Sequence, residues 1–338
     1  VNPTNSQMEN RTTTTVSPMA TSVTCAAFNT IVPQLLIEKL HYVMKVNPYL
    51  SMWIGDFMTN RLQRVRLGEV VSDSRTLNVG AAQGCVLSPI LFTLLTSDSP
   101  VSPSCNIVKY ADDTCIVGLI SNNEETAYRE GVDKFMEWCK QTSLFLNTSK
   151  TKEMIFDFRK TGIGEHEEIS IGGDAIEQVS EYKYLGTIVD DKLKWDENTK
   201  KIQSKGNQRL YFLRKLRSFN VRSRTLALFY QSVVQSVICF SSVAWFSGLT
   251  GKNKTKLTRV VSQASRIIGI PMQQLEDIVQ SALLTRLDII MKDESHPLHD
   301  EVFVNRSGRI RLPKVRTERY RQSFLIAACK AFNSEFNR

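Results

Sequence analysis

Two adjacent carboxylates, Asp112 and Asp113, stand in the stretch YADDTCIV between two short runs of strand-forming residues. Carboxylates held on rigid backbone can bind divalent metal ions, and phosphoryl transfer to a growing chain uses two such ions about 4 Å apart. Aspartate is also a favoured turn residue, and a hairpin tip tolerates two of them. Taken alone, the pair favours a turn and leaves a metal site as the alternative.

The sequence before this pair predicts a loop that a nucleotide or a template strand could approach. In GAAQGCVLSPILFTLLTSD, a loop from Gly80 to Gly84 leads into a helix that begins near Ser88 and Pro89. Because glycine lets another molecule come close to the backbone, the N–H groups of this loop and Gln83 are candidate contacts for a nucleotide or a template strand. Further upstream, the residue pattern predicts a helix over 33–45 and a β-hairpin over 63–71 and 74–79.

The remaining elements predict the fold class. Strands flank the aspartate pair, a capped helix follows within 122–144, and EMIFDF and YKYLGTIV have the composition of strands. Strands and helices interleave without a repeat, which favours an α+β fold over a doubly wound sheet. From Asn198 onward the pattern becomes helical, so a different subdomain is expected to start near residue 197.

Charge is segregated along the chain, which has 338 residues and a net charge of +9. Fourteen Lys or Arg and no Asp or Glu lie between Asn198 and Leu275, and a second basic run extends from Arg306 to Arg321. Cations concentrated on one element attract a phosphate backbone, and released counterions drive binding. An ordinary solvated helix face is the alternative for a short run, but the length of this one favours nucleic acid.

Other segments of the sequence indicate in which cellular compartment the protein is expected. The uncharged stretch over 225–251 is long enough to span a membrane, yet its Gln and Ser residues favour a buried helical hairpin. Seven scattered cysteines without CxxC spacing indicate a reducing, intracellular compartment, nuclear or cytoplasmic, and no secretory signal is evident. Residues 1–25 are expected to be an unstructured lead-in, and the first residue, Val1, suggests a fragment.

Four motifs occur in a fixed order and carry a resemblance. They are GAAQGCVLSPILFTLLTSD, KYADDTCIVG, LFLNTSKTKEMIF and EYKYLGTIVDDKLKW, and the tail from His296 onward agrees with them. Together, over roughly residues 26 to 338, they resemble the reverse transcriptase domain of animal non-LTR (LINE-type) retrotransposons, truncated at its N-terminus. The resemblance implies a right-hand polymerase: a palm with an antiparallel sheet, packed helices and partial fingers over 26–196, a basic helical thumb over 197–275, and a C-terminal region over 276–338.

The resemblance also implies roles for individual residues. Asp112 and Asp113 would bind Mg²⁺ or Mn²⁺, and Lys150 would lie near the leaving pyrophosphate as an acid. Phe28 would lie under the sugar of the incoming dNTP, and Gln83 and Gly84 would contact that nucleotide and the RNA template. Tyr184, Leu185 and Gly186 would form the primer grip for a DNA primer. From the basic segment described above, Lys200, Lys201, Lys205 and Arg209 are expected to contact the nucleic-acid backbone. No membrane and no obligate protein partner is implied.

Each role has a structural alternative. Phe28 fits a core aromatic, Lys150 fits a solvated lysine, and the primer-grip residues fit any buried strand with a bulge. A sharper departure is the first motif of the family, which usually carries another metal-binding aspartate just before a sequence like AFNTI. Aligning AFNTI at 27–31 puts Val23 at that position, and no Asp precedes Asp56. We therefore expect an impaired polymerase, or alternatively an inactive remnant that binds RNA or an RNA:DNA duplex.

Overall fold

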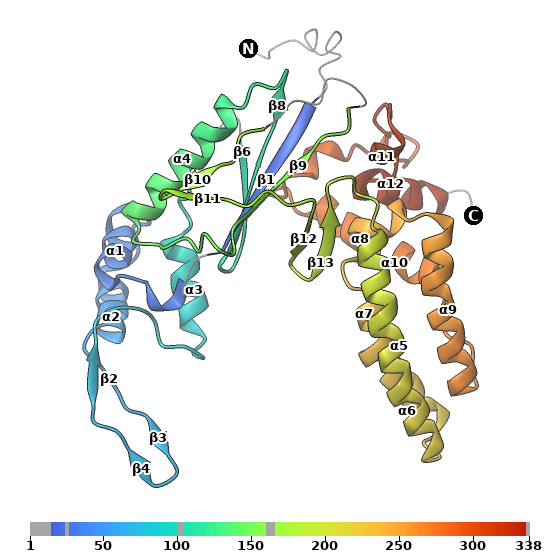
Figure 1. The fold of residues 1–338 in the computed structure, drawn as a ribbon, viewed down its shortest axis with the longest axis horizontal. Helices are drawn as coiled ribbons and strands as arrows, with labels where there is room; N and C mark the ends of the chain where they lie inside the picture. The colour runs from blue at the N-terminus through green and yellow to red at the C-terminus, as the bar shows by residue number, and fades with distance from the viewer. Residues whose placement is uncertain (1–14, 24–26, 101–104, 160–165, 336–338) are drawn as a thin grey trace. The chain divides into compact units, whose positions relative to one another are not determined.

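The computed structural model describes residues 15–23, 27–100, 105–159 and 166–335 (Figure 1). The chain divides into two compact units, residues 1–180 and 181–338. This division differs from the predicted boundary near 197, because the hairpin of YKYLGTIV belongs to the second unit with the helices that follow it.

The first unit contains a five-stranded antiparallel sheet (Figure 1). Its strands are β1 (Thr15–Val23), β6 (Cys105–Tyr110), β7 (Asp113–Gly118), β8 (Ile120–Ser121) and β9 (Lys152–Phe156). β1 is central: it pairs with β7 over 19–23, with β9 over 17–21 and with β8 at its start. The expectation of an unstructured lead-in over 1–25 is wrong for these nine residues, and residues 1–14 lie outside the described part.

Helices supply most of the buried side chains of the first unit, and α4 among them packs on the sheet. They are α1 (Pro33–Glu38) with the π-helical turn η2 (Lys39–Val43), α2 (Pro48–Met58), α3 (Leu87–Leu95) and α4 (Thr126–Gln141). Pro33 and Pro48 each begin a helix, where a missing N–H costs nothing. From α4, Val132, Phe135 and Cys139 join Ile116 of the sheet in one cluster.

Short hairpins complete the first unit. β2 (Arg61–Gln63) pairs with β5 (Arg75–Leu77), and β3 (Arg66–Leu67) pairs with β4 (Val70–Val71) around Gly68, at φ +60°. A hairpin is therefore present, but its tip lies at Gly68, inside the segment 63–71 that was predicted as its first strand. β10 (Ser170–Ile171) and β11 (Asp174–Ala175) form another.

The second unit is helical apart from one hairpin of β12 (Glu181–Tyr184) and β13 (Thr187–Asp190). Its long helices are α5 (Asp196–Ser218), α9 (Gly251–Ile268), α10 (Leu275–Lys292) and α12 (Phe324–Glu335). Shorter elements lie between them: α6 (Ser223–Phe229), η3 (Tyr230–Gln235), α7 (Ser236–Ile238), α8 (Ser242–Trp245), η4 (Phe246–Gly248), η5 (His299–Glu301) and α11 (Glu318–Arg321).

One hydrophobic cluster runs through this unit, and it includes Leu213 of α5, Trp245 of α8, Leu257 of α9 and Leu283 of α10. The predicted separation of a C-terminal region at 276 is therefore not seen, since α10 and α12 complete the core that α5 and α9 begin. Among the described residues no single helix is long and apolar enough to cross a membrane; one pair bent by 41°, Ser223–Ile238 with Ser242–Gly248, passes that test on length and composition only.

Candidate functional site

The aspartate pair lies at the turn between β6 and β7. Asp113 is the first residue of β7 and pairs with Tyr110, while Ala111 takes φ +54° to make the turn. Both aspartates are half-buried, and the next residues of β7, Thr114, Cys115 and Ile116, are buried. The pair is thus both a turn, as its residue types favoured, and a carboxylate pair fixed to the end of a buried strand.

The neighbouring strands bring two further predicted positions to the same end of the sheet. Val23 of β1 pairs directly with Asp113. On the other side of β1, Thr21 pairs with Lys152, the first residue of β9. Lys150 comes two residues before β9 begins, so it lies near the end of the sheet where Val23 and Asp113 pair. The Lys150 side chain is exposed. Antiparallel register therefore places Val23 beside the aspartate pair, where the first motif of the family would put its carboxylate.

Electrostatics at the pair disfavour the charged form of Asp113. Partial burial, and then the neighbouring charge of Asp112, raises the pKa of Asp113 above its usual range. Among the described residues no group of three or more His, Cys, Asp or Glu side chains could hold a metal ion. Asp112 and Asp113 are thus the two carboxylates that this turn offers to a metal ion.

The glycine loop meets the segment that contains Phe28. Ala81 N donates to Phe28 O at 2.7 Å, and Gly80 N donates to Ile31 O at 2.7 Å. A Cβ on Gly80 would lie 2.9 Å from the Asn29 Cα, and its φ is +80°, so the close approach requires glycine. This contact holds the loop against η1 (Ala27–Asn29).

A cavity of about 410 Å³ lies where this loop passes into α3. Phe28, Gln83 and Gly84 all line it, so the structure brings together the predicted nucleotide and template residues. Phe28 also packs on Phe92, with ring centroids 5.5 Å apart, which agrees with its core alternative as well. The Gln83 amide donates to Asn29 Oδ1 at 3.0 Å.

A larger cavity of about 930 Å³ adjoins the same loop on the side of the β2–β5 hairpin. It includes Asn29, Arg61 and Gln83 in its lining. The Arg61 guanidinium donates to the carbonyl oxygens of Val79 and Gly80, at 2.9 and 2.7 Å, and so holds the hairpin against the loop. Sequence reasoning missed Arg61, because only the fold shows that this arginine turns back to the loop.

The predicted primer-contacting residues lie in the second unit. Leu185 and Gly186 form the turn of the β12–β13 hairpin with φ values of +43° and +92°. Along α5, Lys201, Lys205 and Arg209 line a cavity together with Gly186. Lys200 lies outside that cavity lining and forms an ion pair with Glu197 at 3.4 Å. Lys183 and Phe240 also line the cavity, and sequence reasoning did not single them out.

These observations define the class of the protein: a polymerase-like α+β fold. The family model described as "Reverse transcriptase (RNA-dependent DNA polymerase)" matches residues 6–189, more than half of the chain. The chain therefore belongs to the reverse transcriptase family, as the ordered motifs predicted. The match includes β1, which agrees with a strand in place of the expected lead-in. A short match to the model "Alkylated DNA repair protein alkB homolog 8, N-terminal" covers residues 195–236.

Similar curated proteins come from mobile elements of flies. The RNA-directed DNA polymerase from mobile element jockey of Drosophila funebris is 28% identical over 173 residues, 47% of this chain and 18% of that protein. The probable RNA-directed DNA polymerase from transposon BS of Drosophila melanogaster is 26% identical over 257 residues, 72% of this chain and 28% of that protein. The chain thus spans less than a third of these relatives.

Similar solved structures include telomerase of Candida tropicalis in complex with a TWJ fragment of telomeric RNA. The match covers 87% of this chain and 49% of the telomerase chain, with 12% sequence identity and a TM-score of 0.39. Telomerase of Candida albicans gives 10% identity and a TM-score of 0.34 over 84% of this chain.

Proposed function

We propose that this chain is the palm and thumb of a LINE-type reverse transcriptase that binds an RNA template with a DNA primer and transfers nucleotides from dNTP weakly. Family membership supports the activity class, and the order of the motifs supports the element type. In this proposal the first unit provides the palm with partial fingers, the helical unit provides the thumb, and the protein works inside the cell. The proposal differs from an intact polymerase at one position, Val23.

The residue roles in this proposal are those that the resemblance implies, and the geometry of the site supports several of them. Phe28, Gln83 and Gly84 contact the incoming nucleotide and template, since they line one cavity. Lys150 lies at the end of the sheet that also holds the aspartate pair, which suits an acid near pyrophosphate. Tyr184, Leu185 and Gly186 contact the primer from their hairpin. The basic side chains of α5, Lys200, Lys201, Lys205 and Arg209, contact the phosphate backbone.

The observation that carries this proposal is the register of β1. Val23 pairs with Asp113, so the palm keeps the strand that bears the third carboxylate in the family but carries an isopropyl group at that position. Asp112 and Asp113 then face each other's charge without a complete ligand set for Mg²⁺ or Mn²⁺. A single substitution, Val23→Asp, would therefore supply the missing third carboxylate.

Substitution of Val23 by Asp tests the proposal. We expect Val23→Asp to bind Mn²⁺ more tightly than the wild-type chain in a calorimetric titration, because a third carboxylate joins the pair. We expect it to extend a DNA primer on an RNA homopolymer at least 10-fold faster, since a complete ion site stabilises the charge that develops on the transferred phosphoryl group. Asp112→Asn in the same background should abolish both gains.

Val23→Asn is the matched control, because it is polar and of similar size but adds no charge. If Val23→Asn and Val23→Asp behave alike in metal binding and extension, the register-based proposal is wrong. Circular dichroism of each variant shows whether the sheet is kept.

A second candidate function, a silent remnant that binds RNA or an RNA:DNA duplex, is favoured by the same valine. It predicts primer–template binding that weakens steeply with salt. It also predicts that extension stays at background in the wild-type chain. Wild-type incorporation above background that vanishes in Asp112→Asn would exclude this remnant.

A further inference from the structure

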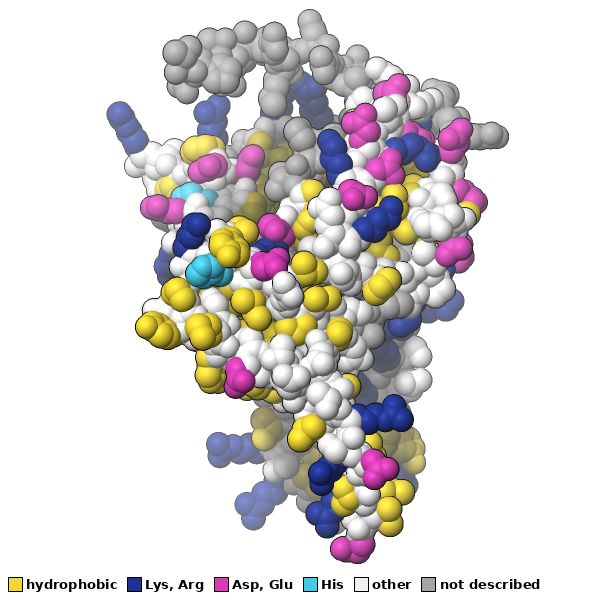
Figure 2. Space-filling model, turned by 90° about the vertical axis from the view of Figure 1, so that its left-hand side faces the viewer, with side chains coloured by type: hydrophobic (Ala, Val, Ile, Leu, Met, Phe, Trp, Pro, Cys, Tyr) yellow, Lys and Arg dark blue, Asp and Glu magenta, His cyan; other side chains and the backbone are white. Residues whose placement is uncertain are grey.

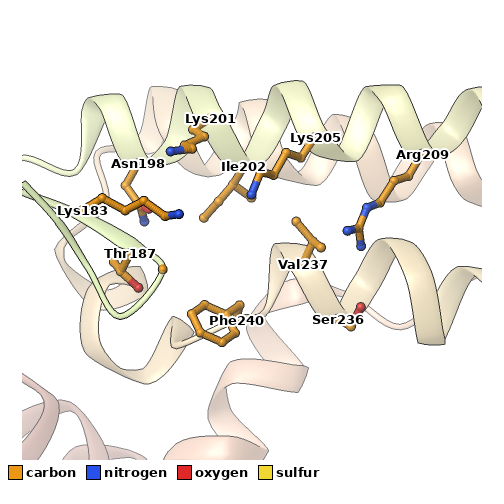
Figure 3. A pocket seen from close by; sticks show the side chains of 11 residues that line it. Lys183, Thr187, Asn198, Lys201, Ile202, Lys205, Arg209, Ser236, Val237 and Phe240 are labelled. Atoms are coloured by element: carbon orange, nitrogen blue, oxygen red, sulfur yellow. The ribbon is translucent and has the colours of Figure 1, made fainter. Parts of the chain in front are cut away.

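A cavity of about 440 Å³ in the second unit combines charge with an apolar wall (Figure 3). It is formed by the β12–β13 hairpin, by α5 and by the segment from α7 to Phe240. Its volume falls in the range of small-ligand sites, roughly 300–1,000 Å³. All of its lining lies in one unit, so the cavity is a property of that unit alone.

Four cationic side chains line this cavity, and none of its lining residues is acidic. Lys183 reaches it from the hairpin, and Lys201, Lys205 and Arg209 reach it from α5 (Figure 3). Within the described part of the chain, nothing forms a hydrogen bond or ion pair with the ammonium groups of Lys183, Lys201 or Lys205. Arg209 differs, since its guanidinium donates to Val233 O. The lysines therefore remain available to an anion from outside.

The opposite part of the cavity is apolar. Phe240 is 51% exposed, and Val237 lines the cavity from the same segment, while Ile202 lines it from α5, between Lys201 and Lys205 (Figure 3). Gly186 fixes the position of the ring: a Cβ at Gly186 would lie 3.0 Å from the Phe240 Cε1. One edge of the ring therefore packs against the hairpin turn, and other parts of it remain accessible to a flat ligand.

A buried amide points to a polar group of the ligand. Asn198 of α5 is only 3% exposed and lines the cavity. Its Oδ1 accepts a hydrogen bond from Ile188 N at 3.2 Å, which orients the side chain, while its Nδ2 has no hydrogen-bond partner. A buried donor without a partner costs free energy unless a ligand or water accepts from it.

We propose that this cavity binds one nucleoside phosphate unit, with the base stacked on Phe240 and the phosphate between Lys201, Lys205 and Lys183. An acceptor of the sugar or base would take the free donor of Asn198. A bare phosphate needs the lysines but not the apolar wall, and a base needs the wall but not the lysines. Lysines and an apolar wall in one cavity therefore favour a ligand that contains both a phosphate and a base. This inference deepens the proposed function and rests on it for the choice of a nucleic-acid strand as the source of the nucleotide.

Binding of a fluorescein-labelled eight-nucleotide single-stranded RNA to the full chain tests this site. Loss of one stacked base should weaken binding about 5- to 150-fold, so we expect Phe240→Leu to raise Kd by a factor in that range. Lys201→Gln with Lys205→Gln should lower the slope of log K against log salt by about 0.7, the value for one lost phosphate contact on a single strand. Lys252→Gln is the matched control, because Lys252 is exposed on α9 and lies outside the cavity lining.

A second readout locates the base. With 5-iodouridine in the RNA, ultraviolet cross-linking followed by peptide mass spectrometry should identify Phe240, and Phe240→Leu should remove that cross-link. AMP and inorganic phosphate serve as competitors: displacement by AMP at low millimolar concentration assigns the site to free nucleotides as well as strands, and displacement by oligonucleotide alone assigns it to strands.

The outcomes separate this inference from the proposed function. If the wild-type chain binds neither the RNA nor a primer–template, the proposed function fails. If it binds both, but Phe240→Leu and the double lysine variant keep the wild-type Kd and salt slope, the cavity is not the site and the proposed function stands. Competition by phosphate as strong as by AMP would also overturn the nucleoside assignment.

Discussion

At the scale of single residues, Glu153 of β9 is a buried acid in the interior of the first unit. It is 2% exposed, accepts a hydrogen bond from the Tyr128 hydroxyl at 3.2 Å, and lies beside Gln178. Burial is the main cause that raises the pKa of Glu153 above its ordinary value of 4.5. The charged form is thus disfavoured in the folded chain.

This carboxyl makes stability depend on pH in a defined direction. Because the folded pKa is raised, stability is greatest below the ordinary value of 4.5 and is lost as the pH rises through the folded pKa. We expect Glu153→Gln, which keeps the shape and removes the titration, to gain stability over the wild-type chain as the pH rises from 4.5 to 8. Urea unfolding at a series of pH values measures the difference.

The control for this prediction is Glu130→Gln on the exposed face of α4. It should shift the curve by a nearly constant amount over the same range. A difference in unfolding free energy that stays constant with pH reflects the altered hydrogen bonds of Glu153→Gln. The prediction therefore concerns only how the difference in unfolding free energy changes with pH. Parallel pH profiles for wild type and Glu153→Gln would refute it.

The sequence identified some residues of the sites but not others, and the difference has a physical reason. Asp112 and Asp113 could be located because turn residues between strands, set among ordered motifs, identify a position in the fold. Glu153 could not, since its burial depends on Tyr128 and on the bridge to Gln178, which are distant in the chain. Lys183 and Phe240 escaped for the same reason, because neither stands in a local pattern that indicates a cavity.

At the scale of elements, α5 and α9 pack closely through Gly206. A Cβ at Gly206 would lie 3.1 Å from Val260 Cγ1 and 3.8 Å from Ile238 Cδ1. We expect Gly206→Leu to destabilise the second unit by about 1–3 kcal/mol, because the side chain overpacks this contact. Gly206→Ala should change stability by less than about 1 kcal/mol, since the better helix propensity of alanine offsets a tight contact.

Ser204→Leu is the matched control, because it places the same side chain two residues away on the exposed part of α5. It should cost less than about 0.5 kcal/mol. Urea unfolding followed by circular dichroism at 222 nm, a helix signal, compares the variants. Equal stability of Gly206→Leu and Ser204→Leu would show that the two helices are not held at this distance.

The strand β1 shows the limit of sequence patterns for elements. Its residues, TVSPMATSV, mix polar residues with Pro18, and proline is rare in a central strand. Pairing with β7 and β9 on its two edges, not local propensity, makes this segment a strand. The strands around the aspartate pair were predicted correctly because their residues are rich in β-branched and aromatic types on both sides of a clear turn.

At the scale of the whole molecule, the described residues form two buried clusters, one in each unit. The sequence predicted a change of architecture but put it at the change of charge, near residue 197. Charge reports on the surface, whereas the units are divided by which side chains share a core. The hairpin of β12 and β13 is placed in the helical unit by its contacts with α5, and no feature of its own composition shows this.

Two cores predict two unfolding transitions. Leu213 is 0% exposed in the second cluster and Phe135 is 2% exposed in the first. Replacement by Ala should cost about 2–5 kcal/mol in each case, because a cavity is left in a packed core. We expect Leu213→Ala to lower the midpoint of one transition and Phe135→Ala to lower the midpoint of the other.

Tryptophan fluorescence can assign the transitions to units. In a background with Trp53→Phe and Trp138→Phe, the remaining tryptophans, Trp195 and Trp245, both lie in the second unit. Urea unfolding followed by this fluorescence should move to lower urea in Leu213→Ala and stay in place in Phe135→Ala, while circular dichroism records both transitions. A fluorescence midpoint that moves equally in the two variants would mean that the cores unfold as one, and the chain would then behave as a single cooperative domain despite its separate clusters.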